Sequence, residues 1–267
     1  MVAGAAADEA VALARATPTL AVGLHIVVIG GRATLPPAQI PCLADADGCF
    51  TGDPFKAGIR YAFSRAARAE LARELRAQFE VFAATGLPLS HVDGHAHMHL
   101  QPDVWDLLVP LAEEFGAAGI RLPRDELRLA LRQTKAQRAD VTSGYAWANG
   151  AGVITQITWA AVFSVLSRWC TGRLRNRCLA VTDRVYGVYM TGRMTEAYVV
   201  EALGSLKVPA VELYFHPTTS PQSESLGPNL GDLTTLLSAA VRSIIEEQHL
   251  YLARYGELRS GMEGDLT

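Results

Sequence analysis

The chain has 267 residues, of which 49% are hydrophobic and 19% are charged, and its formal net charge is −3. This length and composition suit one large α/β domain, or two small ones, with a sizeable core, and they exclude a disordered chain. The slightly negative charge argues against nucleic acid as a partner. We therefore expect a globular chain that does not bind nucleic acid.

The N-terminus and the cysteines indicate the compartment. The four cysteines are sparse and show no CxxC spacing, which fits a reducing compartment better than a disulfide scaffold. No secretory signal is recognisable, because Asp8 and Glu9 follow the first small apolar residues and no basic region precedes them. We expect a cytoplasmic protein.

The predicted elements in the first third of the chain alternate between helix and strand. Residues 5–16 predict an alanine-rich helix, and residues 20–29 predict a strand that is apolar on both faces, as in a buried parallel strand. His25 is the only polar side chain in that strand. Prolines and a glycine mark a long loop over 36–48, and residues 65–84 predict the clearest helix.

A strand with an unusual composition is predicted next, over residues 90–99. Its odd positions are His91, Asp93, His95, His97 and His99. In an extended strand all five would lie on one face, and an apolar core could not satisfy so many imidazoles. Neutral imidazole is the commonest metal ligand in proteins, so the stretch predicts a metal site. Alternate residues lie about 6.6 Å apart, so one or two should bind the metal while the others orient, relay protons or face a substrate.

The remaining elements continue the alternation. Helices are predicted from Pro102 to about Ala118 and over 195–206, 233–248 and 249–255, and strands over 119–123 and 210–215. Strands separated by helices of about 12–20 residues indicate a parallel sheet of βα units and an α/β fold. In such folds chemistry collects at the carboxyl ends of strands. His25, Arg121, Arg124 and His216 all fall at such places, which supports a common site with the histidine-rich strand.

One segment has the composition of a membrane-surface helix. Residues 141–167 contain no charged residue, 153–166 are strongly apolar, and four arginines follow: Arg168, Arg173, Arg175 and Arg177. The apolar part is shorter than the about 20 residues that a spanning helix needs. A basic cluster beside an apolar, aromatic helix is typical of an interfacial helix on an anionic membrane. A buried helix or a homodimer contact would give the same pattern, and these interpretations stay open.

The chain resembles the YdjC/ChbG carbohydrate deacetylase family. The matching pieces are Val22-Gly23-Leu24-His25, Ser90 to His99, Ile120 to Arg124 and Glu212 to Pro217, in the family's order. The Tyr214-Phe215-His216-Pro217 ending, Gly192-Arg193-Met194 and the loop 40–48 look most like the hopanoid-biosynthesis branch, HpnK. The resemblance implies a distorted (β/α) barrel formed by a single domain over 1–267. The composition of the apolar segment adds a membrane-interfacial insertion at about 141–178 to this domain. The resemblance also implies removal of the acetyl group from an N-acetylated amino sugar, N-acetylglucosamine on a hopanoid lipid, by a protein peripheral to the inner membrane.

The resemblance also assigns roles to residues. His25 and His95 correspond to the protein ligands of one divalent metal ion, Mg²⁺ or Zn²⁺, and His216 to the acid at the leaving nitrogen. We expect Asp93 to accept a hydrogen bond from a ligating imidazole or to act as the catalytic carboxylate. The substrate would contact Arg121, Arg124 and His97.

The chain departs from the family pattern in one respect. The family begins with a strand that ends in Asp-Asp-Phe-Gly, which supplies the third metal ligand and the general base, and the chain has no such motif. We therefore expect the first βα unit to be missing, through a late start codon or natural shortening. Catalytic metal sites normally have three protein ligands, so a second hypothesis is a truncated, non-catalytic metal- or lipid-binding homologue.

Overall fold

The computed structural model describes residues 1–124, 129, 131–132, 150–222 and 228–258. The chain divides into two compact units. The first unit combines residues 1–121, 169–181 and the segment from 254 onward, and the second combines residues 122–168 and 182–253. Each unit is built around its own parallel strands.

The first unit is organised by a three-stranded parallel sheet. Its strands are β1 (Val22–Ile26), β2 (Leu89–Gly94) and β3 (Gly119–Ile120), and they lie in this order. The register pairs His25 of β1 with Asp93 of β2. Because neighbouring parallel strands place paired residues side by side, this register brings the two polar side chains together at the carboxyl ends of the strands.

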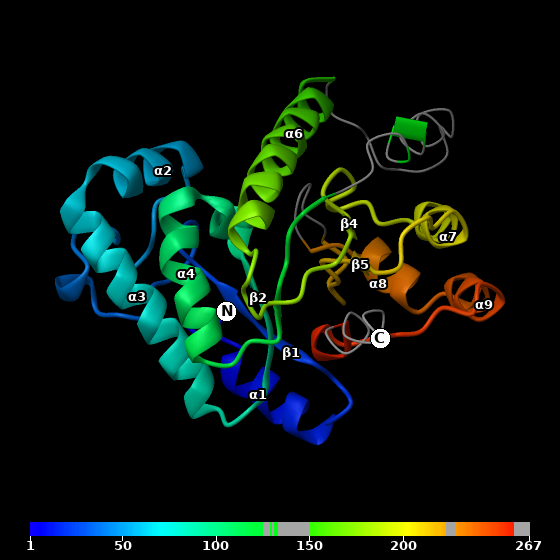
Figure 1. Ribbon diagram of the computed structural model, residues 1–267, viewed down its shortest axis with the longest axis horizontal. Helices are drawn as coiled ribbons and strands as arrows, with labels where there is room; N and C mark the ends of the chain where they lie inside the picture. The colour runs from blue at the N-terminus through cyan, green and yellow to red at the C-terminus, as the bar shows by residue number, and fades with distance from the viewer. Residues whose placement is uncertain (125–128, 130, 133–149, 223–227, 259–267) are drawn as a thin grey trace. The chain divides into compact units, whose positions relative to one another are not determined.

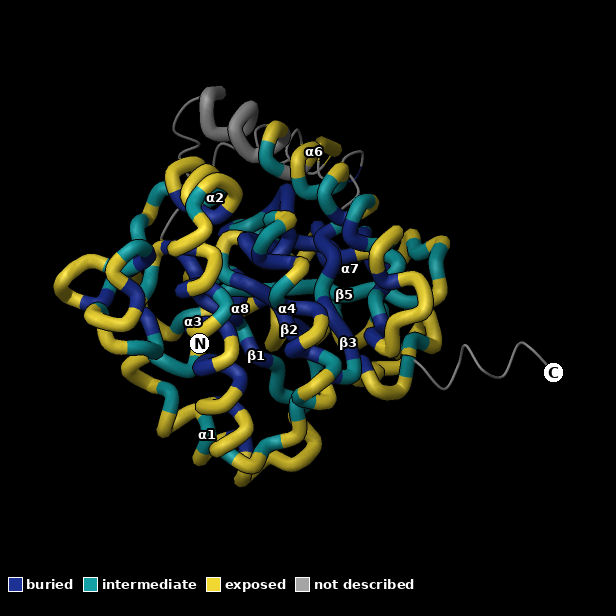
Figure 2. The backbone as a smooth tube through the Cα atoms, turned by 60° about the vertical axis from the view of Figure 1, so that its left-hand side comes forward, coloured by how far each residue is buried: buried dark blue, intermediate teal, exposed yellow. Residues whose placement is uncertain are grey.

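Helices cover this sheet. They are α1 (Ala7–Ala16), α2 (Pro54–Phe63), α3 (Arg65–Ala84) and α4 (Pro102–Glu114), with short 3₁₀ helices η1 (Pro37–Gln39) and η2 (His95–Leu100). Figure 1 shows α2, α3 and α4 side by side next to β1 and β2. Figure 2 shows that α1 is largely exposed, whereas α3, α4 and the strands contribute buried residues to the core of this unit.

A row of buried polar side chains on α3 fixes the loop that follows β1. Glu70, Glu74 and Gln78 are four residues apart and so share one face of the helix. Their oxygens accept hydrogen bonds of 2.8–2.9 Å from four backbone N–H groups within residues 27–42. Buried polar groups are costly unless they are paired, so these bonds hold the loop in one position against the helix.

The second unit has a smaller parallel pair, β4 (Arg184–Tyr186) and β5 (Val211–Leu213). Its helices are α7 (Glu196–Gly204), α8 (Leu230–Leu236) and α9 (Ala239–Glu247), and the long helix α6 (Gly150–Arg173) begins in this unit and ends in the first. Buried tyrosines and methionines form the core of the second unit, among them Tyr186, Met190, Met194 and Tyr198.

Most predicted elements are present, with corrections at their ends. The helix 65–84 is confirmed residue for residue, and β1 is shorter than the predicted strand 20–29. The single helix predicted over 233–248 is wrong, because α8 ends at Leu236 and the hydroxyl of Ser238 caps the start of the next helix. No helix covers 249–254, where His249 has a left-handed backbone (φ 52°). Helix α2 was not predicted, although Asp53-Pro54 is a typical helix start.

The apolar segment predicted to meet a membrane is only partly described. Residues 141–149 lie outside the described part of the chain, and the segment 150–173 is helical, as α6. None of the described helices is long and apolar enough to span a bilayer.

Two glycines of the sheet make room for stacked rings. The imidazole of His91 stacks on the ring of Tyr255, with centroids 4.9 Å apart. A Cβ atom on Gly23 would lie 2.5 Å from His91 Nε2, and one on Gly119 would lie 2.1 Å from Tyr255 Cδ1. Both glycines are therefore required by packing on the sheet rather than by their backbone angles.

We expect Gly119→Ala to lower the free energy of unfolding by about 1–3 kcal/mol, because the new methyl group overlaps Tyr255 and the Ala180 carbonyl oxygen. Urea unfolding followed by circular dichroism measures the change. Gly172→Ala is the matched control, since no atom lies within 4 Å of its added Cβ and alanine favours the helix. Equal stability of the two variants would contradict the packing role.

Candidate active site

The histidine-rich stretch does not continue as a strand. β2 ends at Gly94, and the next six residues form η2. Ala96 and His97 have left-handed backbone angles (φ 48° and 56°), which non-glycine residues rarely adopt and which are commonest at functional sites. The prediction that the five odd positions share one face is therefore wrong, because the chain leaves the extended conformation after Gly94 and redirects His95, His97 and His99.

Asp93 connects two predicted site residues of neighbouring strands. One oxygen of its carboxylate lies 2.8 Å from Nδ1 of His25, and the other forms an ion pair with the guanidinium of Arg121. Arg121 follows β3, so the three side chains come from the ends of the three strands. The hydrogen bond that we expected between Asp93 and an imidazole is present.

The charge on Asp93 is strongly stabilised. Its burial would raise the pKa of the carboxyl, but the Arg121 guanidinium and the hydrogen bond from His25 outweigh burial and hold the pKa well below its usual range. An ionised carboxylate only accepts hydrogen bonds, so His25 donates from Nδ1. This tautomer leaves Nε2 of His25 with its lone pair available to a ligand.

His95 lies beside His25. Their ring centroids are 5.9 Å apart, and the rings are nearly perpendicular, at 77°. Gly30, in the loop after β1, packs against the ring of His95: a Cβ atom there would lie 3.4 Å from His95 Nε2. Gly30 also has a left-handed backbone (φ 61°). The sequence analysis did not single out Gly30, although a glycine directly after an apolar strand is a signal of close backbone approach.

His97 and His99 lie next to each other, with ring centroids 5.9 Å apart. His99 is fully buried, and its Nε2 lies 2.9 Å from the backbone carbonyl oxygen of Arg121. Burial lowers the pKa of His99 to about 4, so the ring is neutral near pH 7 and donates to that carbonyl. Loss of surrounding water also lowers the pKa of His97, with a further contribution from His99. Both residues are therefore suited to position neighbours rather than to carry charge.

The other two predicted site residues, Arg124 and His216, belong to the second unit. The backbone N–H of His216 donates to Asp232 at 2.8 Å, and its ring meets that of Tyr214 edge-on at 5.6 Å. Asp232 is fully buried and also accepts from the N–H of Met194. The sequence analysis missed Asp232, whose only signal is its place in the first turn of a helix capped by Asn229.

The arrangement supplies part of a metal site. Nε2 of His25 and the imidazole of His95 are suitable nitrogen donors for a metal ion. Asp93 accepts a hydrogen bond from the other ring nitrogen of His25 and so orients this imidazole, as carboxylates commonly do for metal-binding histidines. Among the described residues, however, no group of three or more histidine, cysteine, aspartate or glutamate side chains is placed to hold an ion. Asp93 is already shared between His25 and Arg121. The described residues thus fit two ligands of a metal and not the three of a usual catalytic site.

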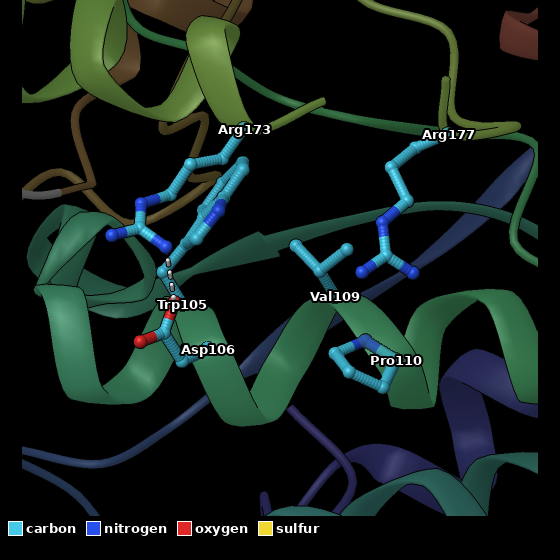
Figure 3. Close-up of a pocket in the computed structure, with 6 residues that line it drawn as sticks. All are labelled: Trp105, Asp106, Val109, Pro110, Arg173 and Arg177. Atoms are coloured by element: carbon cyan, nitrogen blue, oxygen red, sulfur yellow. Dashed lines mark hydrogen bonds and ion pairs between the residues drawn. The ribbon is translucent and has the colours of Figure 1, made fainter. Parts of the chain in front are cut away.

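A small pocket lies elsewhere on the first unit, with a volume of about 140 Å³. It is lined by Trp105, Asp106, Val109, Pro110, Arg173 and Arg177, none of which is a predicted site residue. Figure 3 shows Arg173 directed at Asp106, and Arg177 pairs with Glu113 at 2.7 Å. Since both arginines are paired with carboxylates, the pocket offers no uncompensated charge to a substrate.

We expect Asp93→Asn to lower the free energy of unfolding by about 3 kcal/mol or more at pH 7, because Arg121 is left buried without its counter-ion. The depressed pKa means that the carboxylate stabilises the fold above its unfolded pKa of about 4 and loses that contribution as the pH falls. The difference between the two proteins should therefore shrink below about pH 4. Urea titrations at several pH values measure it.

Glu114→Gln is the control for this experiment. It removes a carboxylate that pairs with Arg76 at an exposed position and should scarcely change stability. The role of Asp93 would be contradicted if Asp93→Asn changed the free energy of unfolding no more than Glu114→Gln does. It would also be contradicted if the difference in this free energy between wild type and Asp93→Asn grew at acidic pH.

The comparisons with known proteins place these residues in a family context. A carbohydrate deacetylase of Brevibacillus brevis is 40% identical over 109 residues, which are 40% of each chain. A carbohydrate deacetylase of Geobacillus stearothermophilus is 38% identical over 125 residues, 47% of this chain and 45% of the relative. A chitooligosaccharide deacetylase of Yersinia pseudotuberculosis is 33% identical over 127 residues, 45% and 46% of the two chains. The alignments thus span less than half the length of these relatives.

The fold has a counterpart among crystal structures. A protein of Enterococcus faecalis V583, provisionally described as a cellobiose-phosphate cleavage protein, superposes with a TM-score of 0.64 at 18% identity, over 94% of this chain and 82% of its own. The likeness confirms the predicted α/β class with parallel sheets and is consistent with the distorted barrel type. The model of the family described as YdjC-like protein matches residues 1–247. The chain belongs to the YdjC-like family.

Proposed function

We propose that the protein is a metal-dependent carbohydrate N-deacetylase, a hydrolase that removes the acetyl group from an N-acetylated amino sugar. The observation that carries the proposal is the imidazole of His25, oriented by Asp93 and placed beside His95 at the carboxyl ends of parallel strands. Family membership and the similarity to carbohydrate and chitooligosaccharide deacetylases support the reaction class. As the specific substrate we propose N-acetylglucosamine linked to a hopanoid lipid, as in the HpnK branch.

We assign His25 and His95 as two ligands of one divalent ion, Mg²⁺ or Zn²⁺. When bound, such an ion polarises the acetyl carbonyl and lowers the pKa of a coordinated water. Asp93 holds His25 in the tautomer that presents Nε2. Its depressed pKa makes it a weak proton acceptor near pH 7, so orientation suits it better than the role of general base.

The remaining residues act on the substrate in this proposal. Arg121, Arg124 and His97 contact the sugar, and His216 donates a proton to the departing nitrogen. In the balanced reaction, water oxygen bonds to the acetyl carbon, the C–N bond breaks, and the products are acetate and the free amine. The hydrogen bond from the His216 N–H to Asp232 and the following Pro217 restrain the backbone that carries this imidazole.

A lipid-linked substrate would be met at a membrane surface, and we propose peripheral association through residues 153–177. Val162 and Val165 of α6 are exposed, and Arg173 covers the ring of Trp169 at 4.2 Å. Phe163 packs partly against the core of the second unit, so one side of the helix is used for packing. The homodimer contact considered for this segment stays a prediction.

The alternative is a non-catalytic metal- or lipid-binding homologue. The observation that favours it is the incomplete ligand set, since the described residues offer two donors where a catalytic site normally has three. Both functions predict metal binding, but only the deacetylase predicts turnover of a substrate. Metal content and acetate release are therefore measured separately.

The metal assignment predicts that His25→Ala and His95→Ala each reduce the metal content of the purified, folded protein. Each change removes one of two nitrogen donors, and loss of one ligand lowers affinity strongly. Inductively coupled plasma mass spectrometry after dialysis against Zn²⁺ measures the stoichiometry. His249→Asn is the control, because asparagine tolerates the left-handed backbone there and the residue belongs to the second unit. Unchanged stoichiometry in both alanine variants would refute the assignment.

The deacetylase assignment predicts acetate release from an N-acetylglucosaminyl lipid when metal is supplied. We expect little activity from the chain alone and clear activity from a version preceded by the Asp-Asp strand of the family, which supplies the third ligand. His216→Ala in the active version should lower kcat by about 10²–10⁴-fold, the contribution of a general acid. An enzyme-coupled acetate assay measures both. Undiminished turnover in His216→Ala would remove His216 from the reaction, and no turnover by either version would support the non-catalytic alternative.

A further inference from the structure

Helix α2 presents an exposed stripe of large apolar side chains. Phe55, Ile59 and Phe63 are four residues apart, and their exposed fractions are 71%, 56% and 85%. Residues at this spacing lie above one another on one face of a helix. Figure 2 shows the exposed residues of α2 in yellow between buried ones. Single exposed apolar residues are normal on a protein surface, whereas an aligned row with two phenylalanines indicates a contact surface.

The opposite face of α2 anchors the helix to the first unit. Ala57 and Tyr61 are buried, and the hydroxyl of Tyr61 donates to the backbone carbonyl of Val28. Asp53 caps the N-terminus through the N–H groups of Phe55 and Lys56. The helix is therefore fixed in its orientation, and the apolar stripe is held away from the core.

Positive charge predominates around the stripe. Residues 54–69 contain four basic residues, Lys56, Arg60, Arg65 and Arg68, and no acidic one, whereas the whole chain has a net charge of −3. Lys56 and Arg68 have carboxylate neighbours in Asp53 and Asp103. No carboxylate of the described residues pairs with Arg60 or Arg65. This surface thus combines exposed apolar side chains with an excess of positive charge.

We infer that the α2 surface, defined by Phe55, Lys56, Ile59, Phe63 and Arg65, docks on an anionic lipid bilayer. Interfacial helices insert aromatic and aliphatic side chains at the headgroup boundary while flanking cations meet the anionic lipids. The stripe lies exposed on one face of a single helix, whereas helices that bind peptides line a groove with their apolar side chains, so the stripe suits a bilayer better than a peptide. In a symmetric contact between two copies the same surface meets itself and brings like charges together. The inference is independent of the deacetylase proposal.

Sedimentation of the full chain with vesicles tests the inference. We expect binding to vesicles of phosphatidylcholine with phosphatidylglycerol, weaker binding at 0.5 M salt, and none to phosphatidylcholine alone, because the cations act through a screened attraction. Phe55→Ser combined with Phe63→Ser should lower the partition coefficient at least about tenfold, since two rings lose their apolar insertion. Lys56→Gln combined with Arg65→Gln should reduce the salt dependence.

Two controls separate this surface from others. Leu13→Ser removes an equally exposed apolar side chain from α1, a helix that starts with acidic residues, and should bind vesicles like wild type. Arg173→Gln combined with Arg175→Gln alters the basic cluster after α6. Vesicle binding that survives the phenylalanine changes but is lost in the arginine variant would overturn the α2 assignment. Absence of vesicle binding would overturn it as well, and a dimer by light scattering that the phenylalanine changes dissociate would assign α2 to self-association instead.

Discussion

The site depends on the carboxylate of Asp93, which accepts a hydrogen bond from an imidazole and forms an ion pair with a guanidinium. Asp93 lies at the end of the central strand of the first unit and meets His25 on one side and Arg121 on the other. A buried charge is stable only when it is paired, so the three strand ends must keep their register for the site to exist. The same carboxylate therefore serves the fold and the chemistry. It links the ends of the three strands through His25 and Arg121, and it fixes the tautomer of His25 in which Nε2 carries the lone pair.

Two independent sets of buried hydrogen bonds hold the residues around Asp93 in place. Buried Glu74 and Gln78 of α3 hold the loop after β1, and that loop carries Gly30, on which the ring of His95 packs. On the other side, His99 bonds to the backbone of Arg121. Polar groups buried with full hydrogen bonding specify one arrangement, which is the preorganisation that a catalytic or metal site needs.

The expected hydrogen bond between Asp93 and an imidazole is present, whereas the predicted strand over 90–99 is wrong after Gly94. His25 and Asp93 could be expected near each other because both were predicted in strands of one parallel sheet, at whose carboxyl ends functional residues collect. Period-two reasoning failed beyond Gly94, because the left-handed residues Ala96 and His97 have no signal in a single sequence. The division of 233–248 into two helices could have been read from Ser238, whose capping hydroxyl competes with helix continuation. The buried role of Asp232 could not, since burial is a tertiary property.

The C-terminal part of the first unit has a consequence for how the chain folds. Gly119 lies opposite Ala180 in a parallel bridge whose hydrogen bonds are made by Ala118 and Ile120, and it packs against the ring of Tyr255, so residues that complete this sheet arrive from far along the chain. During synthesis residues 1–121 emerge without the segments that finish their core, and the last of these, from residue 254 onward, appears only after residues 122–253, which include the whole second unit. Contacts with such long sequence separation slow folding and leave sheet edges exposed in the meantime. Truncations near Tyr255 would thus impair assembly of a sheet whose strands were synthesised first.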